Sequence, residues 1–256
     1  PGSGVADTIN FIASLGAISV TGSVLPSISD TAGTVMTGVD STVQLTQTGL
    51  AAGSDGLTLA AGPNKITAMI IRNFPDAAIV VAGNDNKLFQ NTLYSNGTAV
   101  VVGGVTGLNL RNNLITNNTS AGVSATSTAG TINFNGYFSN GGSGNVHCTG
   151  GCTIGANSIK AKSRYTNTGA NDFSLLASSP AINRGIDLGV DQPDMNGTGT
   201  GGNFNSGAPD MGARESSFAT PAATASASRR TWRRTSSSPI PRFRSRKGPS
   251  PPGRTR

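Results

Sequence analysis

The segment HCTGGC contains the only histidine of the chain and both of its cysteines, the side chains most used in metal and redox chemistry. His147 and Cys148 are adjacent, and Cys152 follows four residues later. Three potential ligands without a fourth make a poor zinc site. Neighbouring strand residues point to opposite faces, so His147 and Cys148 are also poorly placed as a catalytic pair. For a secreted protein we favour a disulfide between Cys148 and Cys152, with free thiols as the alternative.

Carboxylates are the second group of side chains that could carry chemistry. A polysaccharide lyase needs clustered carboxylates for Ca²⁺ beside a basic residue, and a glycosidase needs two facing carboxylates. Between residues 56 and 142 the acidic residues are only Asp76 and Asp85, and no glutamate precedes Glu215. The basic residues of that range are Lys65, Arg72, Lys87 and Arg111. We therefore predict no catalytic and no cofactor-binding residue, and expect a protein without enzymatic activity rather than an enzyme.

The segment DLGVDQPDMNG resembles a calcium-binding loop in composition. It brings Asp187, Asp191, Asp194 and Asn196 close together in the sequence. The spacing differs from that of an EF-hand loop, and no bidentate glutamate follows at the required distance. We predict no metal site here and expect a loop held by hydrogen bonds from its backbone to aspartate side chains.

Asparagines recur at a fixed spacing of 22 residues through the middle of the chain. One series contains Asn91, Asn113 and Asn135, and a second contains Asn96, Asn118 and Asn140. Lys65 and Lys87 are separated by the same distance. Internal periods of 20–50 residues are typical of solenoids, in which successive repeats stack on one another.

Two classes of solenoid have a period of this size. The segment LNLRNNLI, residues 108–115, fits the strand of a leucine-rich repeat. The other half of that repeat requires a helical segment, but this chain has AIVVAG and AVVVGG, which are β-branched and flanked by glycine. We read each period as strand, turn, strand, turn. The pattern predicts an all-β fold, a single-stranded parallel β-helix.

The period also predicts which side chains meet inside the β-helix. Residues one period apart should lie above one another at the strand spacing of about 4.8 Å. Leu93, Ile115 and Phe138 are expected to form one apolar stack. Leu108 and Leu110 are expected to meet Ile132 and Phe134. The asparagines are expected at bends, because asparagine tolerates left-handed backbone and hydrogen-bonds neighbouring turns.

The charge of the chain is unevenly distributed. From Ser216 to Arg256 there are nine arginines and one lysine without any acidic residue, which leaves nine basic and 12 acidic residues, a net charge of −3, in positions 1–215. The tail is predicted to be disordered because it contains too little apolar surface to offset chain entropy. It could bind an anionic surface, link the body to an anchor, or be translated out of frame. We expect no specific nucleic-acid binding, since a charge run alone is weak evidence.

Three segments resemble bacterial surface proteins of the choice-of-anchor Q type. ADTINFIASLGAISVTGSVLPSISD is similar to their opening, and the middle resembles the right-handed parallel β-helix repeat shared with pectate lyases. SPAINRG and APDMGARE are similar to their closing motifs, with Met211 in place of the usual isoleucine. The resemblance covers roughly residues 6–215 and implies a right-handed β-helix in a secreted or cell-surface protein. No recognisable anchor follows Glu215.

We expect three regions: a β-helix with irregular first coils over residues 1–158, a loop-rich cap over 159–215, and a disordered basic tail over 216–256. In the cap, Ile182 and Met211 are predicted to cover the apolar end of the last coil. Asp191 and Asp210 are predicted to accept hydrogen bonds from the backbone. No window of 18 apolar residues occurs, so we expect no transmembrane segment.

The function predicted from these features is that of an extracellular scaffold for surface display, adhesion or glycan binding, probed by cell-surface or environmental polysaccharide. The fold alone does not decide between binding and catalysis, because β-helices carry both. The alternative is therefore a carbohydrate-active enzyme of the lyase or glycosidase type on the same fold. We expect a monomer that needs no cofactor.

Overall fold

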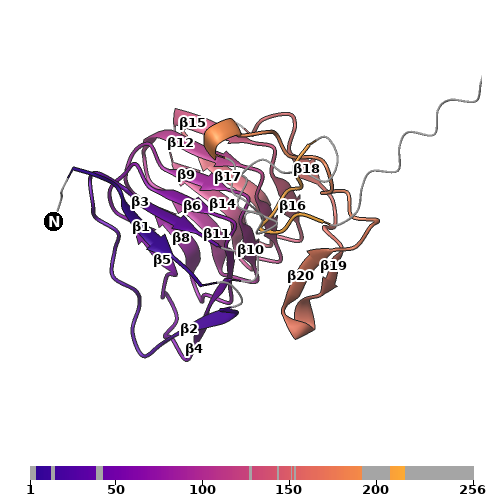
Figure 1. Ribbon diagram of the computed structural model, residues 1–256, viewed down its shortest axis with the longest axis horizontal. Helices are drawn as coiled ribbons and strands as arrows, with labels where there is room; N and C mark the ends of the chain where they lie inside the picture. The colour runs from indigo at the N-terminus through magenta and orange to yellow at the C-terminus, as the bar shows by residue number, and fades with distance from the viewer. Residues whose placement is uncertain are drawn as a thin grey trace, which may run out of the picture. The chain divides into compact units, whose positions relative to one another are not determined.

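The computed structural model describes residues 4–12, 15–38, 43–126, 129–142, 144–150, 152, 154–191 and 208–216. Within these ranges the chain is almost entirely β-structure, with two 3-10 helices, η1 (Thr168–Ala170) and η2 (Gly189–Asp191). The strands form a parallel β-solenoid, as the sequence period predicts (Figure 1). A separate antiparallel hairpin lies beside it.

Three parallel sheets form the walls of the solenoid. Sheet A consists of β1 (Asp7–Asn10), β3 (Thr34–Thr37), β6 (Lys65–Thr67), β9 (Lys87–Phe89), β12 (Thr106–Arg111) and β15 (Ala129–Asn133). Sheet B consists of β2 (Ala17–Thr21), β4 (Gln44–Thr48), β7 (Ile70–Arg72), β10 (Thr92–Tyr94), β13 (Leu114–Thr116), β16 (Gly136–Phe138) and β18 (Ile159–Lys160). Sheet C consists of β5 (Leu57–Leu59), β8 (Ala77–Val81), β11 (Thr98–Val102), β14 (Ala121–Thr126) and β17 (Gly144–Thr149).

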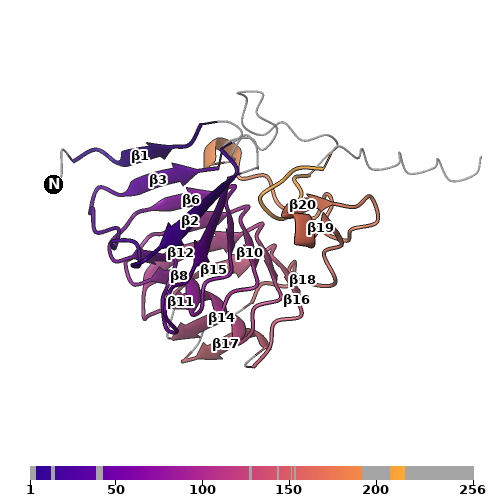
Figure 2. The ribbon, with the colours of Figure 1, turned by 90° about the horizontal axis from the view of Figure 1, so that it is seen from below.

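Each complete coil contains three strands, one from each sheet, and not the two predicted from the sequence (Figure 2). The extra strand arises where a corner divides KLFQNTLY into β9 and β10. The segments AIVVAG and AVVVGG form β8 and β11, as predicted. A β-branched run packs well on a pleated surface, which explains why these segments are strands.

Asparagine ladders hold the three corners together. At the corner between sheets A and B, Asn91 Nδ2 donates to Asn113 Oδ1 at 3.1 Å, and Asn113 Nδ2 donates to Asn135 Oδ1 at 2.9 Å. The series Asn96, Asn118 and Asn140 does the same between sheets B and C. At the third corner, Asn64 Nδ2 donates to Asn86 Oδ1 at 2.8 Å. Both 22-residue series of the sequence are therefore structural ladders.

The left-handed backbone at these corners belongs to the residue before each ladder asparagine. Gln90, Asn112 and Phe134 have φ between 52° and 59°, whereas the ladder asparagines that follow them do not have positive φ. The sequence-based expectation placed this conformation on the ladder residues themselves and was wrong on this point. The preceding residue makes the turn, which frees the asparagine side chain to point inward and bond its equivalents.

The interior is a continuous apolar core, with two changes from the predicted stacks. Leu93 and Ile115 pair with Tyr137 and not with Phe138, which faces outward. The ladders fix the period at 22 residues, so the residue 23 positions after Ile115 cannot occupy the inner position. Leu110 pairs with Ile132 as expected, but a register shift places Leu108 opposite Gly130. Phe134 lies in the corner.

The first coils are less regular, and they leave apolar residues at the N-terminal end of the solenoid. The predicted strand segments there form β1 to β4. Val5 and Ile12 are 68% and 72% exposed, and an apolar cavity of about 360 Å³ opens among Ile9, Phe11 and Leu25. At the other end, Cys148, Cys152 and Ile154 pack against the core.

The C-terminal segment, residues 159–191 and 208–216, lies against the outer face of sheet B. Met211 is fully buried, as predicted, but it packs on Leu114 of β13 and not on the end of the last coil. Ile182 is only partly buried in the same cluster. The outer face attracts this segment because Leu114 is apolar and Gly136 leaves room for the Met211 sulfur. The predicted cap is therefore a flank.

Asn112 and Asp210 fix this flank through backbone hydrogen bonds. The Asn112 side chain accepts from Ile186 N–H at 2.9 Å and donates to the Ile186 carbonyl at 2.7 Å. Asp210 accepts from the N–H groups of Asn183 and Ser216, both at 2.7 Å, as predicted. Burial raises the pKa of Asp210 despite these hydrogen bonds.

The division of the chain into 1–158, 159–215 and 216–256 stays a prediction. Contacts group Pro1–Pro221 into one compact unit and Ala222–Arg256 into another. The predicted disorder of the tail concerns residues that lie outside the described ranges, apart from Ser216, which is buried beside Asp210.

Candidate functional site

A groove of about 760 Å³ runs between the outer face of sheet B and the C-terminal segment. Its floor contains Tyr94, Thr116 and Phe138, which occupy equivalent positions on β10, β13 and β16. These three side chains alternate with the inward stack of Leu93, Ile115 and Tyr137, so they face outward. The solenoid therefore repeats one outward position at every coil, at about 4.8 Å per step.

The opposite wall of this groove, which we call the hairpin groove, comes from the segment 162–168 and from Leu176 and Ser178. Lys162 and Arg164 are exposed lining residues. Neither forms an ion pair within the described part of the chain, where the salt bridges involve other residues. The described lining contains no aspartate or glutamate. The hairpin groove thus combines aromatic rings, hydroxyl and amide groups, and two free cations.

An aromatic cluster positions this wall. The hairpin of β19 (Tyr165–Asn167) and β20 (Asp172–Leu175) places Tyr165 and Phe173 against Tyr94 of β10. Tyr165 and Phe173 are also in contact with each other, and all three pairs have the edge-to-face geometry that aromatic rings prefer, with centroids 5.1–6.0 Å apart. Ile70 and Ala213 complete the apolar contact beneath them.

The Tyr165 hydroxyl links the two walls of the groove. It lies 3.2 Å from the Thr116 hydroxyl on the floor. Burial raises the pKa of Tyr165 to about 12, although the hydrogen bond with Thr116 opposes this shift. The phenol is therefore neutral at physiological pH, and it serves as a hydrogen-bonding group and not as a base.

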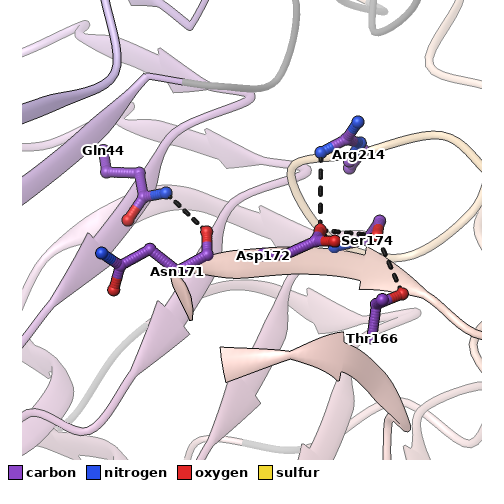
Figure 3. A network of polar contacts seen from close by, with 6 residues as sticks. All are labelled: Gln44, Thr166, Asn171, Asp172, Ser174 and Arg214. Atoms are coloured by element: carbon purple, nitrogen blue, oxygen red, sulfur yellow. Dashed lines mark hydrogen bonds and ion pairs between the residues drawn. The ribbon is translucent and has the colours of Figure 1, made fainter. Parts of the chain in front are cut away.

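Polar contacts hold the tip of the hairpin against the solenoid (Figure 3). Asp172 accepts a hydrogen bond from the Ser174 hydroxyl at 2.6 Å and forms an ion pair with Arg214 at 3.7 Å. The hydrogen bond with Ser174 lowers the pKa of Asp172, with a smaller contribution from Arg214. Gln44 on β4 donates to the Asn171 carbonyl at 2.8 Å. Contacts at both ends of β20 thus fix the groove wall.

The carboxylates considered for catalysis do not gather in this groove. Asp76 and Asp85 are exposed residues of turns on different coils. Asp76 instead has Asp55 as a neighbour one coil earlier, which the sequence comparison of residues 56–142 missed. Burial raises the pKa of Asp55, and the charge of Asp76 raises it further. Asp55 accepts a hydrogen bond from Ala77 N–H at 2.9 Å, which gives it a structural role.

The segment HCTGGC forms no metal site. Cys148 and Cys152 are joined by a disulfide with Cα atoms 5.6 Å apart. His147 is exposed, while Cys148 is half-buried and packs against the core. Within the described ranges, no three histidine, cysteine, aspartate or glutamate residues are grouped as a metal site would require.

The segment DLGVDQPDMNG is only partly described. Asp194 and Asn196 lie outside the described residues, and the Asp187 carboxylate accepts from Gly189 N–H. Asp191 pairs with Lys87 at 2.7 Å and Lys65 at 3.6 Å, contacts with side chains where backbone hydrogen bonds were predicted. The repeat stacks these two lysines directly, so their mutual repulsion favours an anion across them. Burial raises the pKa of Asp191, but the two lysines outweigh this and lower it overall.

The residues of the hairpin groove were not identified from the sequence. Tyr94 was read only as part of a strand, and Lys162, Arg164 and Tyr165 as part of a cap. A weak indication was present in KAKSRYTN, where cations and a tyrosine are interleaved within eight residues. The groove itself depends on how the hairpin lies across sheet B, which no local pattern specifies.

Comparisons with known proteins give no match to a protein-family model, a curated protein or a solved structure. The resemblance to the choice-of-anchor Q type therefore rests on the quoted motifs alone. No helix in the described part of the chain is both long and apolar enough to cross a membrane.

Proposed function

We propose that this protein is an extracellular, surface-associated scaffold that binds glycans in the hairpin groove. The observation that carries this proposal is the combination of aromatic rings and hydrogen-bonding side chains in one open groove. Sugar rings present apolar C–H faces and a rim of hydroxyl groups. Aromatic surfaces suit the former, and Thr116, Asn117 and the Tyr165 hydroxyl suit the latter.

The geometry of the floor favours a linear polymer. Tyr94 and Phe138 occupy the same outward position two coils apart, which corresponds to about 10 Å along the solenoid axis. A chain of sugar rings laid along this axis would meet the two aromatic side chains in succession, with Thr116 between them. A repeating surface of this kind matches a repeating ligand without a deep enclosed pocket.

The arrangement supports binding over cleavage. Glycosidases require two carboxyl groups facing the scissile bond, and lyases require carboxylates that hold a cation. The described lining of the hairpin groove contains neither. Asp55 and Asp76 are neighbours, but they lie at the turn before sheet C and not on the outer face of sheet B.

The extracellular location is supported by the disulfide between Cys148 and Cys152, because disulfides persist in oxidising compartments. The motifs similar to choice-of-anchor Q proteins add the expectation of a bacterial surface. Both parts of the proposal can be tested together by fractionating the source cells and labelling free thiols. Recovery in the cytoplasm with both cysteines reduced would contradict them.

Glycan binding is tested with Phe138→Ala in the full chain. Removing this ring should weaken binding to a panel of immobilised polysaccharides about five- to tenfold, because an aromatic contact contributes on the order of 1 kcal/mol. Val101→Ala is the matched control, since Val101 is an outward, half-buried residue of β11 on sheet C. Equal binding by both variants would exclude the hairpin groove as the site.

A further inference from the structure

We propose that the hairpin groove selects acidic polysaccharides, with Lys162 and Arg164 as the residues that recognise the anionic groups. This inference rests on the proposed glycan-binding function and names the class of ligand. It makes the two cations the specificity-determining residues, while the aromatic floor supplies contact area common to all sugars.

The first argument is that these cations have no internal task. Lys65 and Lys87 pair with Asp191, Arg214 pairs with Asp172, and the Arg72 guanidinium donates to Gln44 at 2.8 Å. Lys162 and Arg164 instead project along the rim of the groove without an ion pair among the described residues. Cations with structural roles elsewhere in this body are matched, and these two are left for a ligand.

The second argument is the contrast with the remainder of the body. Positions 1–215 carry a net charge of −3, so cations facing a groove without carboxylates are not the result of a generally basic surface. Such a groove concentrates positive potential locally even when the whole body repels anions. An acidic polymer would therefore be drawn to this groove in preference to the rest of the solenoid.

The third argument concerns discrimination. Arginine and lysine form charge-assisted hydrogen bonds with carboxylates or sulfates that are about twice as strong as neutral ones. A neutral polymer laid on the same floor would partly cover Lys162 and Arg164 without supplying an anion, which costs binding free energy. The same groove should then prefer a charged chain to an uncharged chain with the same backbone.

The experiment compares a uronic-acid polymer, alginate, with the same polymer after carboxyl reduction, using the full chain and low salt. Wild-type protein should bind alginate at least tenfold more tightly, because each charge-assisted hydrogen bond contributes on the order of 1.5–3 kcal/mol. The double substitution Lys162→Gln with Arg164→Gln should remove this preference and leave binding to the reduced polymer unchanged. Lys160→Gln is the matched control, since Lys160 is exposed close by but does not line the groove.

A third ligand, poly-L-glutamate, separates recognition of an acidic sugar from attraction of any polyanion. Equal affinity for alginate and its reduced form would overturn the acidic preference and leave glycan binding standing. Binding to neither would overturn the proposed function as well. Binding to alginate and polyglutamate alike, unaffected by the double substitution, would place the attraction elsewhere, such as the arginine-rich residues 229–256, and overturn this inference.

Discussion

The stacked coils and the C-terminal flank bury apolar side chains against the same strands, but they are specified in different ways. In the coils, each contact recurs every 22 residues, so Asn91, Asn113 and Asn135 make the same hydrogen bonds in turn. On the flank, Met211 and Asn112 make contacts that occur once. Repetition makes the coils tolerant in their surface residues and sensitive at their corners, whereas the flank depends on individual side chains.

This difference also separates stability from recognition. The outward positions of a coil are free to vary because they take no part in the ladders, and Tyr94, Thr116 and Phe138 are three different residues at one repeated position. The flank then selects among these positions by lying across some and leaving others open. The candidate binding site therefore lies at the boundary between the repeated and the unique part of the chain.

The largest effect is expected at a ladder corner. Asn113→Ala removes the acceptor for Asn91 N–H and Nδ2 and the donor to the Leu88 carbonyl. Each buried group left without a partner costs about 1–3 kcal/mol, so the free energy of unfolding should fall by about 4 kcal/mol. Denaturant melts would measure it. Asn109→Ala in the same coil is the control, because the Asn109 side-chain oxygen has no described hydrogen-bond partner; equal losses would remove the distinction between corner and surface.

A comparable but smaller loss is expected on the flank. Met211→Ala should lower the free energy of unfolding by about 3 kcal/mol, within the range for a buried methionine truncated in a core. Leu176→Ala, at a side chain that is 44% exposed, should cost much less. Thermal melts followed by circular dichroism would detect both. A Met211 variant that melts like the parent would show that the flank is not packed on β13.

A pH-dependent effect of about 1 kcal/mol or less is expected at Asp191. Its pKa is lowered in the folded protein, so its contribution is present above the unfolded value near 3.9 and is lost as pH falls through the folded pKa. Asp191→Asn should therefore destabilise the protein at pH 7 and have no effect near pH 2. Asp7→Asn, at an exposed residue of β1, provides the comparison. A loss that persists at the acidic end would indicate that packing, and not charge, accounts for the effect.

The smallest effect is expected at the tip of the hairpin. Arg214 and Asp172 are 43% and 38% exposed and 3.7 Å apart, and an ion pair this exposed contributes little. Arg214→Ala should change the free energy of unfolding by less than about 0.5 kcal/mol, as measured in urea. A loss above 2 kcal/mol would mean that the flank relies on charge more than on its aromatic cluster.

The same contrast explains what could be predicted from the sequence. The β-solenoid follows from the 22-residue period, since a repeated asparagine and a β-branched run specify corner and strand in every coil. The inner stack was off by one at Phe138, because apolar spacing alone does not show which residue the ladder turns inward. The hairpin groove could not be predicted, since the contacts of Tyr165 with Thr116 and Tyr94 join residues 49 and 71 positions apart with no period between them.

The constant ladder spacing has a consequence for how such a molecule can change in length. A duplicated or deleted block of 22 residues within the regular coils would keep every asparagine opposite another asparagine, so the corners would re-form one step along. A block of any other size would bring a corner residue opposite a strand residue in all three columns at once. The ladder thus acts as a ruler that permits growth in whole coils and rejects fractions of one, which makes the length of the molecule an inheritable, stepwise property.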